Sequence, residues 1–215
     1  MNHPTRPVLK SNDARAPELA VAVLAGGASS RFGEDKALVR LCREGPTLLE
    51  RTVSIGLRIS PDTVVIGHER YEELELGVPV VPDRFPGAGP LAGVHTALSA
   101  TSANRLMVLA CDAPCLSFEL LQAMASWQTD ASLLLPRTAD GRWHPMPGVY
   151  HRGLRADIEA VLAEGERAIV SLIGRVTVDA FPEAELRRLD PMMDSLFSLN
   201  SPEQIERARR CVTCN

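Results

Sequence analysis

The sequence predicts an α/β protein in which short strands and helices alternate around a largely parallel sheet. Three observations carry this prediction. Apolar runs of strand length, rich in β-branched residues, alternate with segments whose apolar residues recur at helical spacing. Polar or glycine-rich loops follow the strands at residues 26–36, 82–90 and 111–114. No internal repeat or linker divides the 215 residues, so a single domain is expected.

The elements expected in the first half begin with a buried strand at residues 20–25. A helix at residues 47–59 is indicated by a capping box, in which Thr47 and Glu50 would satisfy each other's backbone N–H groups, and by an apolar face. The remaining elements of this half are expected to be strands at 63–66 and 78–81, a small-residue helix at 91–100, a strand at 105–110 and a helix at 117–127.

The second half continues the alternation. Its expected elements are strands at 131–135 and 146–151, a helix at 154–164, and short strands at 175–179 and 196–199. Pro147 weakens the second of these strands because proline cannot donate to a sheet. The last helix has a strong start signal, with Ser201 as N-cap, Pro202 at its first position and Gln204 three residues after the cap.

Composition and chain ends exclude several classes of protein. Residues 1–16 are polar and contain no apolar signal region, so a flexible tail is expected before a domain at 17–210 and a short tail at 211–215. The net charge of −4 and the aromatic content of 4% argue against a nucleic-acid partner. No apolar run reaches the roughly 20 residues of a membrane helix, so no membrane partner is expected and the cytoplasm is the default location.

The five cysteines do not predict disulfides. Their odd number and irregular spacing argue against a disulfide framework. Cys211 and Cys214 form a C-x-x-C pair that could be a redox pair or half of a zinc site. No second matched pair or nearby histidine accompanies them, so two reduced thiols in a tail are the simpler expectation.

The most informative segment is residues 21–38, which read VAVLAGGASSRFGEDKAL. An apolar strand ends at Gly26 and Gly27, and the loop that follows carries Arg31 and Lys36. Backbone N–H groups without side chains beside them, together with two cations, suit a polyphosphate. The glycine spacing is neither that of a Walker P-loop nor that of a dinucleotide fingerprint. A glycine turn after a buried strand is the simpler alternative.

Other segments predict parts of the same site, because ligands of parallel sheets bind beyond the carboxyl ends of the strands. Residues 83–93, DRFPGAGPLAG, end at a helix N-terminus and suit phosphate, although alone they could be a structural loop. Asp112 follows an apolar strand, where it could coordinate Mg²⁺ or cap the following turn. His144 and Asn200 could contact an acceptor, or could be a solvent-facing histidine and a turn residue.

Taken together, these segments resemble the motifs of molybdenum cofactor guanylyltransferases. Residues 21–38 are similar to L-A-G-G-x-S-x-R-M-G-x-D-K, and residues 83–93 match D-x-x-P-G-x-G-P-L-A-G at every specified position. Residues 111–114 resemble C-D-x-P, and residues 198–203 resemble N-V-N-T-P-E. The resemblance extends over about residues 21–208.

The resemblance implies a single Rossmann-like, three-layer domain of the glycosyltransferase-A or nucleotidyltransferase type. It implies transfer of GMP from GTP to molybdenum-loaded molybdopterin with release of pyrophosphate, and downstream molybdoenzyme maturation proteins as further partners. The catalytic residues implied are Arg31, Lys36 and Asp112, with Mg²⁺ as cofactor on Asp112. The nucleotide-binding residues implied are Leu24, Ala25, Gly26, Gly27, Lys36, Asp83 and Asp112. On the acceptor side, His144 and Asn200 are implied.

Two alternatives stay open. A related nucleotidyltransferase could use CTP or another phosphorylated acceptor, although G-G in the first motif and C-D-x-P in the third favour guanine. The chain could also be a nucleotide-binding regulator that has lost catalysis, because Phe32 stands where the motif has Met and Ser198 where it has Asn.

Overall fold

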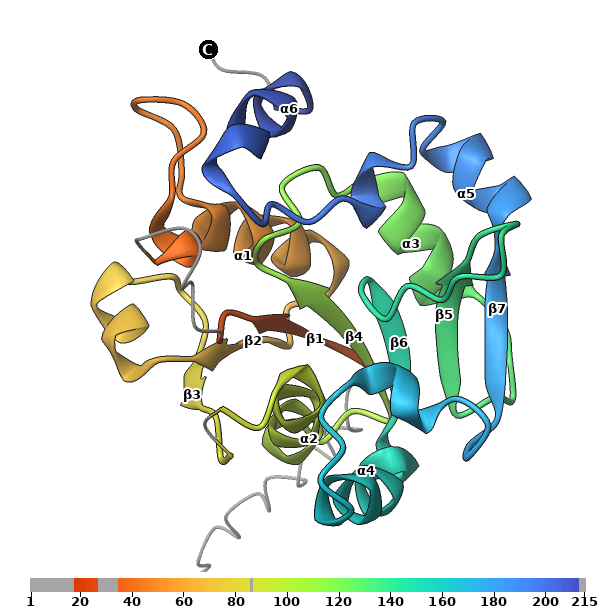
Figure 1. Cartoon of the computed structure of the whole chain (residues 1–215). Helices are drawn as coiled ribbons and strands as arrows, with labels where there is room; N and C mark the ends of the chain where they lie inside the picture. The colour runs from red at the N-terminus through yellow and green to blue at the C-terminus, as the bar shows by residue number, and fades with distance from the viewer. Residues whose placement is uncertain (1–17, 27–34, 86, 213–215) are drawn as a thin grey trace, which may run out of the picture.

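The computed structural model describes residues 18–26, 35–85 and 87–212 (Figure 1). The tail expected at residues 1–16 lies outside these ranges, as do Gly27 and Arg31 of the first motif and Cys214 near the chain end. No helix of the described residues is long and apolar enough to cross a membrane.

A seven-stranded sheet with the order β3-β2-β1-β4-β6-β5-β7 forms the centre of the molecule. Its strands are β1 (Leu19–Leu24), β2 (Thr63–Gly67), β3 (Val80–Pro82), β4 (Arg105–Ala110), β5 (Leu133–Arg137), β6 (Gly148–His151) and β7 (Val178–Pro182). β6 runs antiparallel to its neighbours β4 and β5, and every other neighbouring pair is parallel. The predicted α/β class with a mainly parallel sheet is therefore confirmed.

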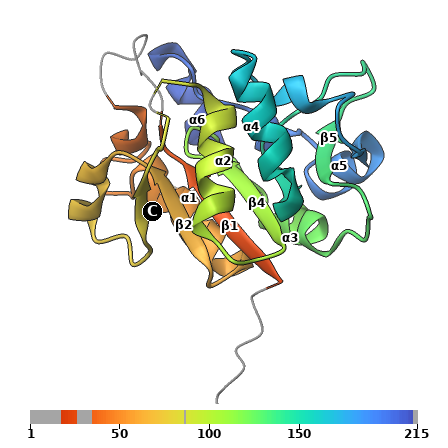
Figure 2. The same ribbon diagram turned by 90° about the horizontal axis from the view of Figure 1, so that it is seen from below.

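Helices cover both faces of this sheet and complete three layers (Figures 1 and 2). They are α1 (Leu48–Ile59), α2 (Pro90–Ala100), α3 (Phe118–Ser126), α4 (Arg155–Ala163), α5 (Glu183–Leu189) and α6 (Ile205–Arg210). Side chains of β1 alternate between the two faces, as those of a strand must. Ala22 and Leu24 pack with α2 and α4, whereas Val21 packs with α3 and Val23 with α1.

Local signals in the sequence account for most element boundaries. Thr47 caps α1 in the predicted box, with its side chain accepting from Glu50 N and its own N–H donating to the Glu50 carboxylate. β4 has the predicted bounds. β6 begins at Gly148, directly after Pro147, because proline has no N–H to donate to a sheet.

The strand expected at residues 196–199 does not form, and this prediction was wrong. Residues 194–196 form a 3-10 turn, η5 (Asp194–Leu196), because the Asp190 carboxylate accepts from Ser195 N at 2.7 Å. Leu199 then makes one backbone bond, to Asp112 O, and buries its side chain. Two interactions specific to this fold thus override an apolar pattern typical of a strand.

The sequence did not predict the helix α5 or the 3-10 segments, of which η2 (Glu69–Leu74) is the longest. The helix α5 has seven residues, and η2 has six. Both are rich in glutamate and each buries only one residue, so neither carries the long apolar stripe by which a helix is identified.

The cysteines depart from the sequence expectation, because Cys115 and Cys211 form a disulfide with their Cα atoms 5.3 Å apart. Cys42 is also disulfide-bonded, whereas Cys111 is a free, buried thiol. Cys211 and the buried Val212 therefore belong to the folded domain and not to a tail. Spacing along the chain could not reveal the bond, because its two ends are 96 residues apart and meet only through the fold.

Candidate functional site

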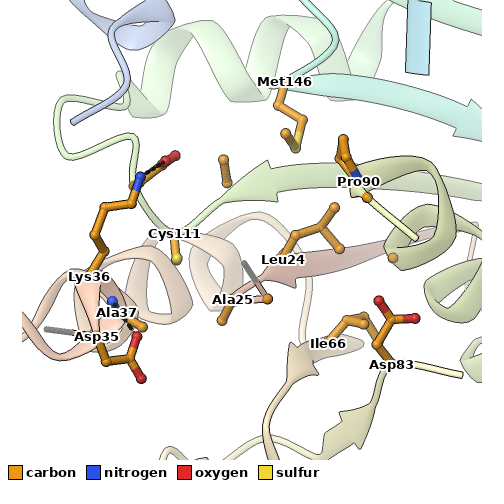
Figure 3. Close-up of a pocket in the computed structure, with 15 residues that line it drawn as sticks. Leu24, Ala25, Asp35, Lys36, Ala37, Ile66, Asp83, Pro90, Cys111 and Met146 are labelled. Carbon is orange, nitrogen blue, oxygen red and sulfur yellow. Dashed lines mark hydrogen bonds and ion pairs between the residues drawn. The ribbon is translucent and has the colours of Figure 1, made fainter. Parts of the chain in front are cut away.

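A hollow of about 250 Å³ lies at the carboxyl ends of β1, β2 and β4 (Figure 3). This is the rim at which parallel α/β sheets bind ligands. The residues of the sequence motifs that line it are Leu24, Ala25, Gly26, Asp35, Lys36, Asp83, Gly89, Pro90, Gly93, Cys111 and Asp112. Three motifs that are far apart in the sequence therefore meet in one cavity.

Lys36 is the centre of the polar contacts at this rim. Its Nζ lies 3.0 Å from Asp112 Oδ2, and it also donates to Leu199 O at 3.2 Å and to Asn200 Oδ1 at 3.3 Å. Figure 3 shows the lysine extending along one wall of the hollow toward the end of β4. The side chains of Lys36 and Asp112 are 20% and 23% exposed, so both can still meet a ligand from solution.

The backbone at Lys36 is fixed by the residue that precedes it. Asp35 is the N-cap of the 3-10 helix η1 (Lys36–Leu38), and its Oδ1 accepts from Ala37 N at 3.1 Å. An aspartate side chain that caps its own turn is a local arrangement that the sequence favours. Lys36 thus starts from a defined turn and not from a mobile loop end.

Asp112 does not cap the helix that follows it. The N-cap of α3 is Ser117, whose hydroxyl accepts from Leu120 N. The turn at Asp112 is instead held by its backbone, since Cys111 N donates to Leu24 O and Leu199 N donates to Asp112 O. The carboxylate is therefore directed to Lys36, and the capping alternative is removed.

The second motif is a loop braced from outside by the segment after α4. Gly89 has a φ of +80°, and a Cβ at this position would lie 3.0 Å from both the backbone oxygen and the Cβ of Arg167. Arg167 accepts from Leu91 N through its carbonyl and donates to Gly87 O through its guanidinium. Only glycine combines this conformation with this close approach, which explains the residue type in the motif.

Asp83 lies at the start of this loop, across the hollow from Lys36 (Figure 3). Its Oδ1 accepts from Phe85 N at 3.0 Å and from the Thr96 hydroxyl at 3.1 Å. These bonds tie the end of β3 to α2 and leave Asp83 among the residues that line the cavity.

The two acceptor-side residues of the sequence analysis take different positions in the structure. Asn200 accepts from Lys36, which lines the main hollow, whereas His144 lines a different and more open hollow of about 700 Å³. There His144 lies 3.3 Å from the Thr138 hydroxyl, and burial, with a smaller contribution from Arg142, lowers the pKa of the imidazole. His144 is therefore a largely neutral group at pH 7, which is unsuited to charge pairing with an anion.

Several contacts of the site could not be found from sequence reasoning. The Arg167 brace and Met146, which lines the hollow, come from segments that no motif identified, and the Leu199 carbonyl is a backbone group that the motif at residues 198–203 does not specify. A backbone carbonyl or a bracing arginine has no residue-type signature, so only the fold reveals it.

The oxygen atoms at the rim fit a hard divalent cation. Asp112 Oδ2 and Asn200 Oδ1 both accept from Lys36 Nζ, at 3.0 and 3.3 Å, so two oxygen atoms that could bind a cation lie on either side of a position that the lysine ammonium holds. Within the described ranges no cluster of three or more His, Cys, Asp or Glu residues could hold a metal by itself. This donor set suits Mg²⁺, which is bound by one or two protein oxygens and completes its shell with phosphate and water.

The chain is similar to known proteins over most of its length. A family model described as a MobA-like NTP transferase domain matches residues 21–179. The chain is 34% identical over 188 residues to a probable molybdenum cofactor guanylyltransferase of Chloroflexus aggregans, covering 86% of this chain and 90% of that protein. It is also 34% identical over 200 residues to a molybdenum cofactor guanylyltransferase of Rhizobium johnstonii, covering 89% and 92%.

A solved structure is similar over nearly the same range. The molybdopterin-guanine dinucleotide biosynthesis protein A of Archaeoglobus fulgidus superposes with a TM-score of 0.75 at 27% identity, covering 89% of this chain and 97% of that one. The likeness thus extends over the whole sheet and both helical layers.

Proposed function

The chain belongs to the MobA-like NTP transferase family, and from this premise we propose that it transfers GMP from GTP to the phosphate of molybdenum-loaded molybdopterin. One observation supports this most strongly. Lys36, Asp112 and Asn200 converge at the carboxyl rim of the sheet, beside the hollow lined by the first two motifs. The dinucleotide product would pass to proteins that mature molybdoenzymes.

The proposed reaction needs no nucleophilic side chain. An ionised oxygen of the acceptor phosphate attacks the α-phosphorus of GTP, a new P–O bond forms, and the bond between the α-phosphorus and the bridging oxygen breaks to release pyrophosphate. The attacking oxygen is already ionised at neutral pH, so no general base is required. Catalysis then consists of positioning and charge neutralisation.

Cationic residues and oxygen-bearing residues have different roles in the proposed reaction. Lys36 neutralises charge that builds on the leaving phosphates, and Arg31 would add a second cation from the part of the motif outside the described ranges. Asp112 and Asn200 would hold Mg²⁺, which when bound supplies further charge neutralisation at the phosphates. Asp83 and the strand end at Leu24, Ala25 and Gly26 lie on the side we assign to the nucleoside.

The base preference is the test of this proposal. A guanine site must pair the exocyclic amine, the ring N–H and O6, and each buried polar group left unpaired costs about 1–3 kcal/mol. We expect GTP to be preferred over CTP by at least roughly tenfold in kcat/KM, the equivalent of about one lost hydrogen bond. Pyrophosphate release is measured with molybdenum-loaded molybdopterin and each nucleotide in competition.

Two results would contradict the proposal in different ways. Equal or better use of CTP would make the chain a cytidylyltransferase. If the chain binds a nucleotide but releases pyrophosphate with none of GTP, CTP, ATP and UTP, it is a binding protein that has lost catalysis. ATP and UTP also serve as controls for release that does not depend on the base.

A further inference from the structure

Tyr71 lies outside every sequence motif, yet it contacts both ends of the first motif. It lies on η2, its side chain is 1% exposed, and its hydroxyl is 2.7 Å from Asp35 Oδ2 and 3.2 Å from Ala25 O. Burial, and in second place the hydrogen bond to the Asp35 carboxylate, raises the pKa of the phenol. The hydroxyl therefore stays protonated at neutral pH and acts as a donor.

The two acceptors stand at the two ends of the glycine motif. Ala25 directly follows β1, and Asp35 directly precedes Lys36 and caps its turn. Residues 26–34 connect these two positions along the chain. A single buried hydroxyl thus lies within hydrogen-bond distance of both anchor points of the segment expected to bind phosphates.

Two neighbouring residues support the Tyr71 side chain and its partner Asp35. A Cβ at residue 67 would come 2.9 Å from the Tyr71 ring and 3.2 Å from Ala25 O, so Gly67 leaves the space that the ring occupies. Arg70 forms an ion pair with the same carboxylate oxygen of Asp35. Both carboxylate oxygens of Asp35 are therefore engaged within the protein, which suits a structural support and not a metal ligand.

We propose that Tyr71 and Asp35 act as positioning residues that fix the ends of the glycine motif and thereby direct Lys36 to the phosphates of the nucleotide. This deepens the proposed function and rests on it. The gain is preorganisation, because a lysine that starts from a fixed turn loses less freedom when it binds its ligand. Neither residue contacts the phosphates itself.

The test uses Tyr71→Phe, which keeps the ring and removes only the hydroxyl. We expect the dissociation constant for GTP with Mg²⁺, measured by calorimetry without molybdopterin, to rise by about tenfold, as for one hydrogen bond to a charged group. Asp35→Asn keeps a good N-cap but removes the charge, and should weaken binding in the same direction. The melting temperature of each variant reports whether it is folded.

A matched control separates positioning from stability. Thr101 is buried, and its hydroxyl donates to Asp62 Oδ2 at 2.9 Å near the amino-terminal end of β2, away from the hollow. Thr101→Val should lower the melting temperature but leave the GTP dissociation constant unchanged. If Tyr71→Phe behaves in the same way, the tyrosine only stabilises the fold and the proposal is overturned.

A double-mutant cycle tests whether Tyr71 acts through Lys36. In a Lys36→Met background, adding Tyr71→Phe should change the dissociation constant by less than about twofold, because coupled residues are not additive. Full additivity would show that Tyr71 acts independently of the lysine and would overturn the proposal. If the wild type prefers CTP, the base assignment fails, and the same cycle is run with CTP as the probe.

Discussion

At the scale of single residues, the ion pair of Lys36 and Asp112 concentrates the chemistry of the site. Neither side chain is fully buried, and the pair shares its surroundings with Asn200 and the Leu199 carbonyl. In a partly buried ion pair, the cost of desolvating the two charges offsets much of their mutual attraction, so the pair contributes little net stability. The charges at this rim are therefore better explained by what they bind than by what they stabilise.

This view of the ion pair gives a prediction for the substitution of Asp112 by asparagine. Asp112→Asn keeps the shape of the side chain but removes the charge that we assign to Mg²⁺, so kcat should fall by about a hundredfold or more, as when a group that stabilises the transition state is lost. The melting temperature should change little. Pyrophosphate release is measured over a range of Mg²⁺ concentrations.

Asp62→Asn is the matched control for this experiment. Asp62 accepts from Thr101 outside the hollow, so its loss should affect stability more than turnover. Near-normal turnover of Asp112→Asn at limiting Mg²⁺ would show that Asp112 is not the metal ligand.

The residue types of the site were predictable, but their contacts were only partly so. Lys36, Asp83 and Asp112 line one hollow, as the motifs indicated. His144 lies in a different hollow, which is lined by residues of its own loop between β5 and β6 and by residues 192–198. Loop placement of this kind depends on tertiary contacts that no local pattern encodes.

At the scale of elements, the sequence predicted best where local chemistry decides the structure. The capping box of α1 and the bounds of β4 are determined by residues within the elements themselves. The strand expected at 196–199 failed because the Asp190 carboxylate, five residues before Ser195, and the sequence-distant turn at Asp112 determine that segment. Element type thus follows from local pattern only until a long-range contact outweighs it.

The capping box gives a prediction for stability and its pH dependence. Thr47→Ala removes the acceptor for Glu50 N and should lower the free energy of unfolding by about 1 kcal/mol. The backbone N–H of Thr47 donates to the Glu50 carboxylate and is the main cause of that group's lowered pKa. Chemical denaturation at several pH values measures both effects.

The sign of the pH effect follows from the lowered pKa. The stability that the Glu50 carboxylate contributes is fully present above its ordinary pKa of 4.5 and is lost as the pH falls through the lowered value. Ser54→Ala, at an exposed position inside the same helix, is the control and should leave stability unchanged or slightly raised at every pH, because alanine favours the helix more than serine does. An equal loss in Ser54→Ala would show that the effect does not come from the cap.

At the scale of the whole molecule, the C-terminal segment contacts a hollow whose lining residues, apart from Met146, lie between residues 24 and 112. Leu199 and Asn200 contact Lys36, and α6 packs with Leu41 and Leu48 in a separate apolar cluster. The motif at residues 198–203 indicated this segment, but not the way in which it is held. The disulfide between Cys115 and Cys211 ties it to the turn that carries Asp112.

This covalent link should contribute measurably to stability. A disulfide restricts the unfolded chain more as the enclosed loop lengthens, and here its ends are 96 residues apart. We expect oxidised wild type to exceed oxidised Cys115→Ser by about 2–4 kcal/mol in free energy of unfolding. The bond of Cys42 is present in both proteins, so the difference isolates the Cys115–Cys211 bond.

Reduction supplies the internal control for this prediction. With excess dithiothreitol, each disulfide is exchanged for two thiols while the dithiol is oxidised, so wild type and Cys115→Ser should then unfold at nearly the same denaturant concentration. If the two proteins already coincide before reduction, or if Cys115 and Cys211 are alkylated in the native oxidised protein, the bond does not hold the C-terminal segment. In that case the apolar cluster around Leu199 alone would keep Asn200 beside Lys36.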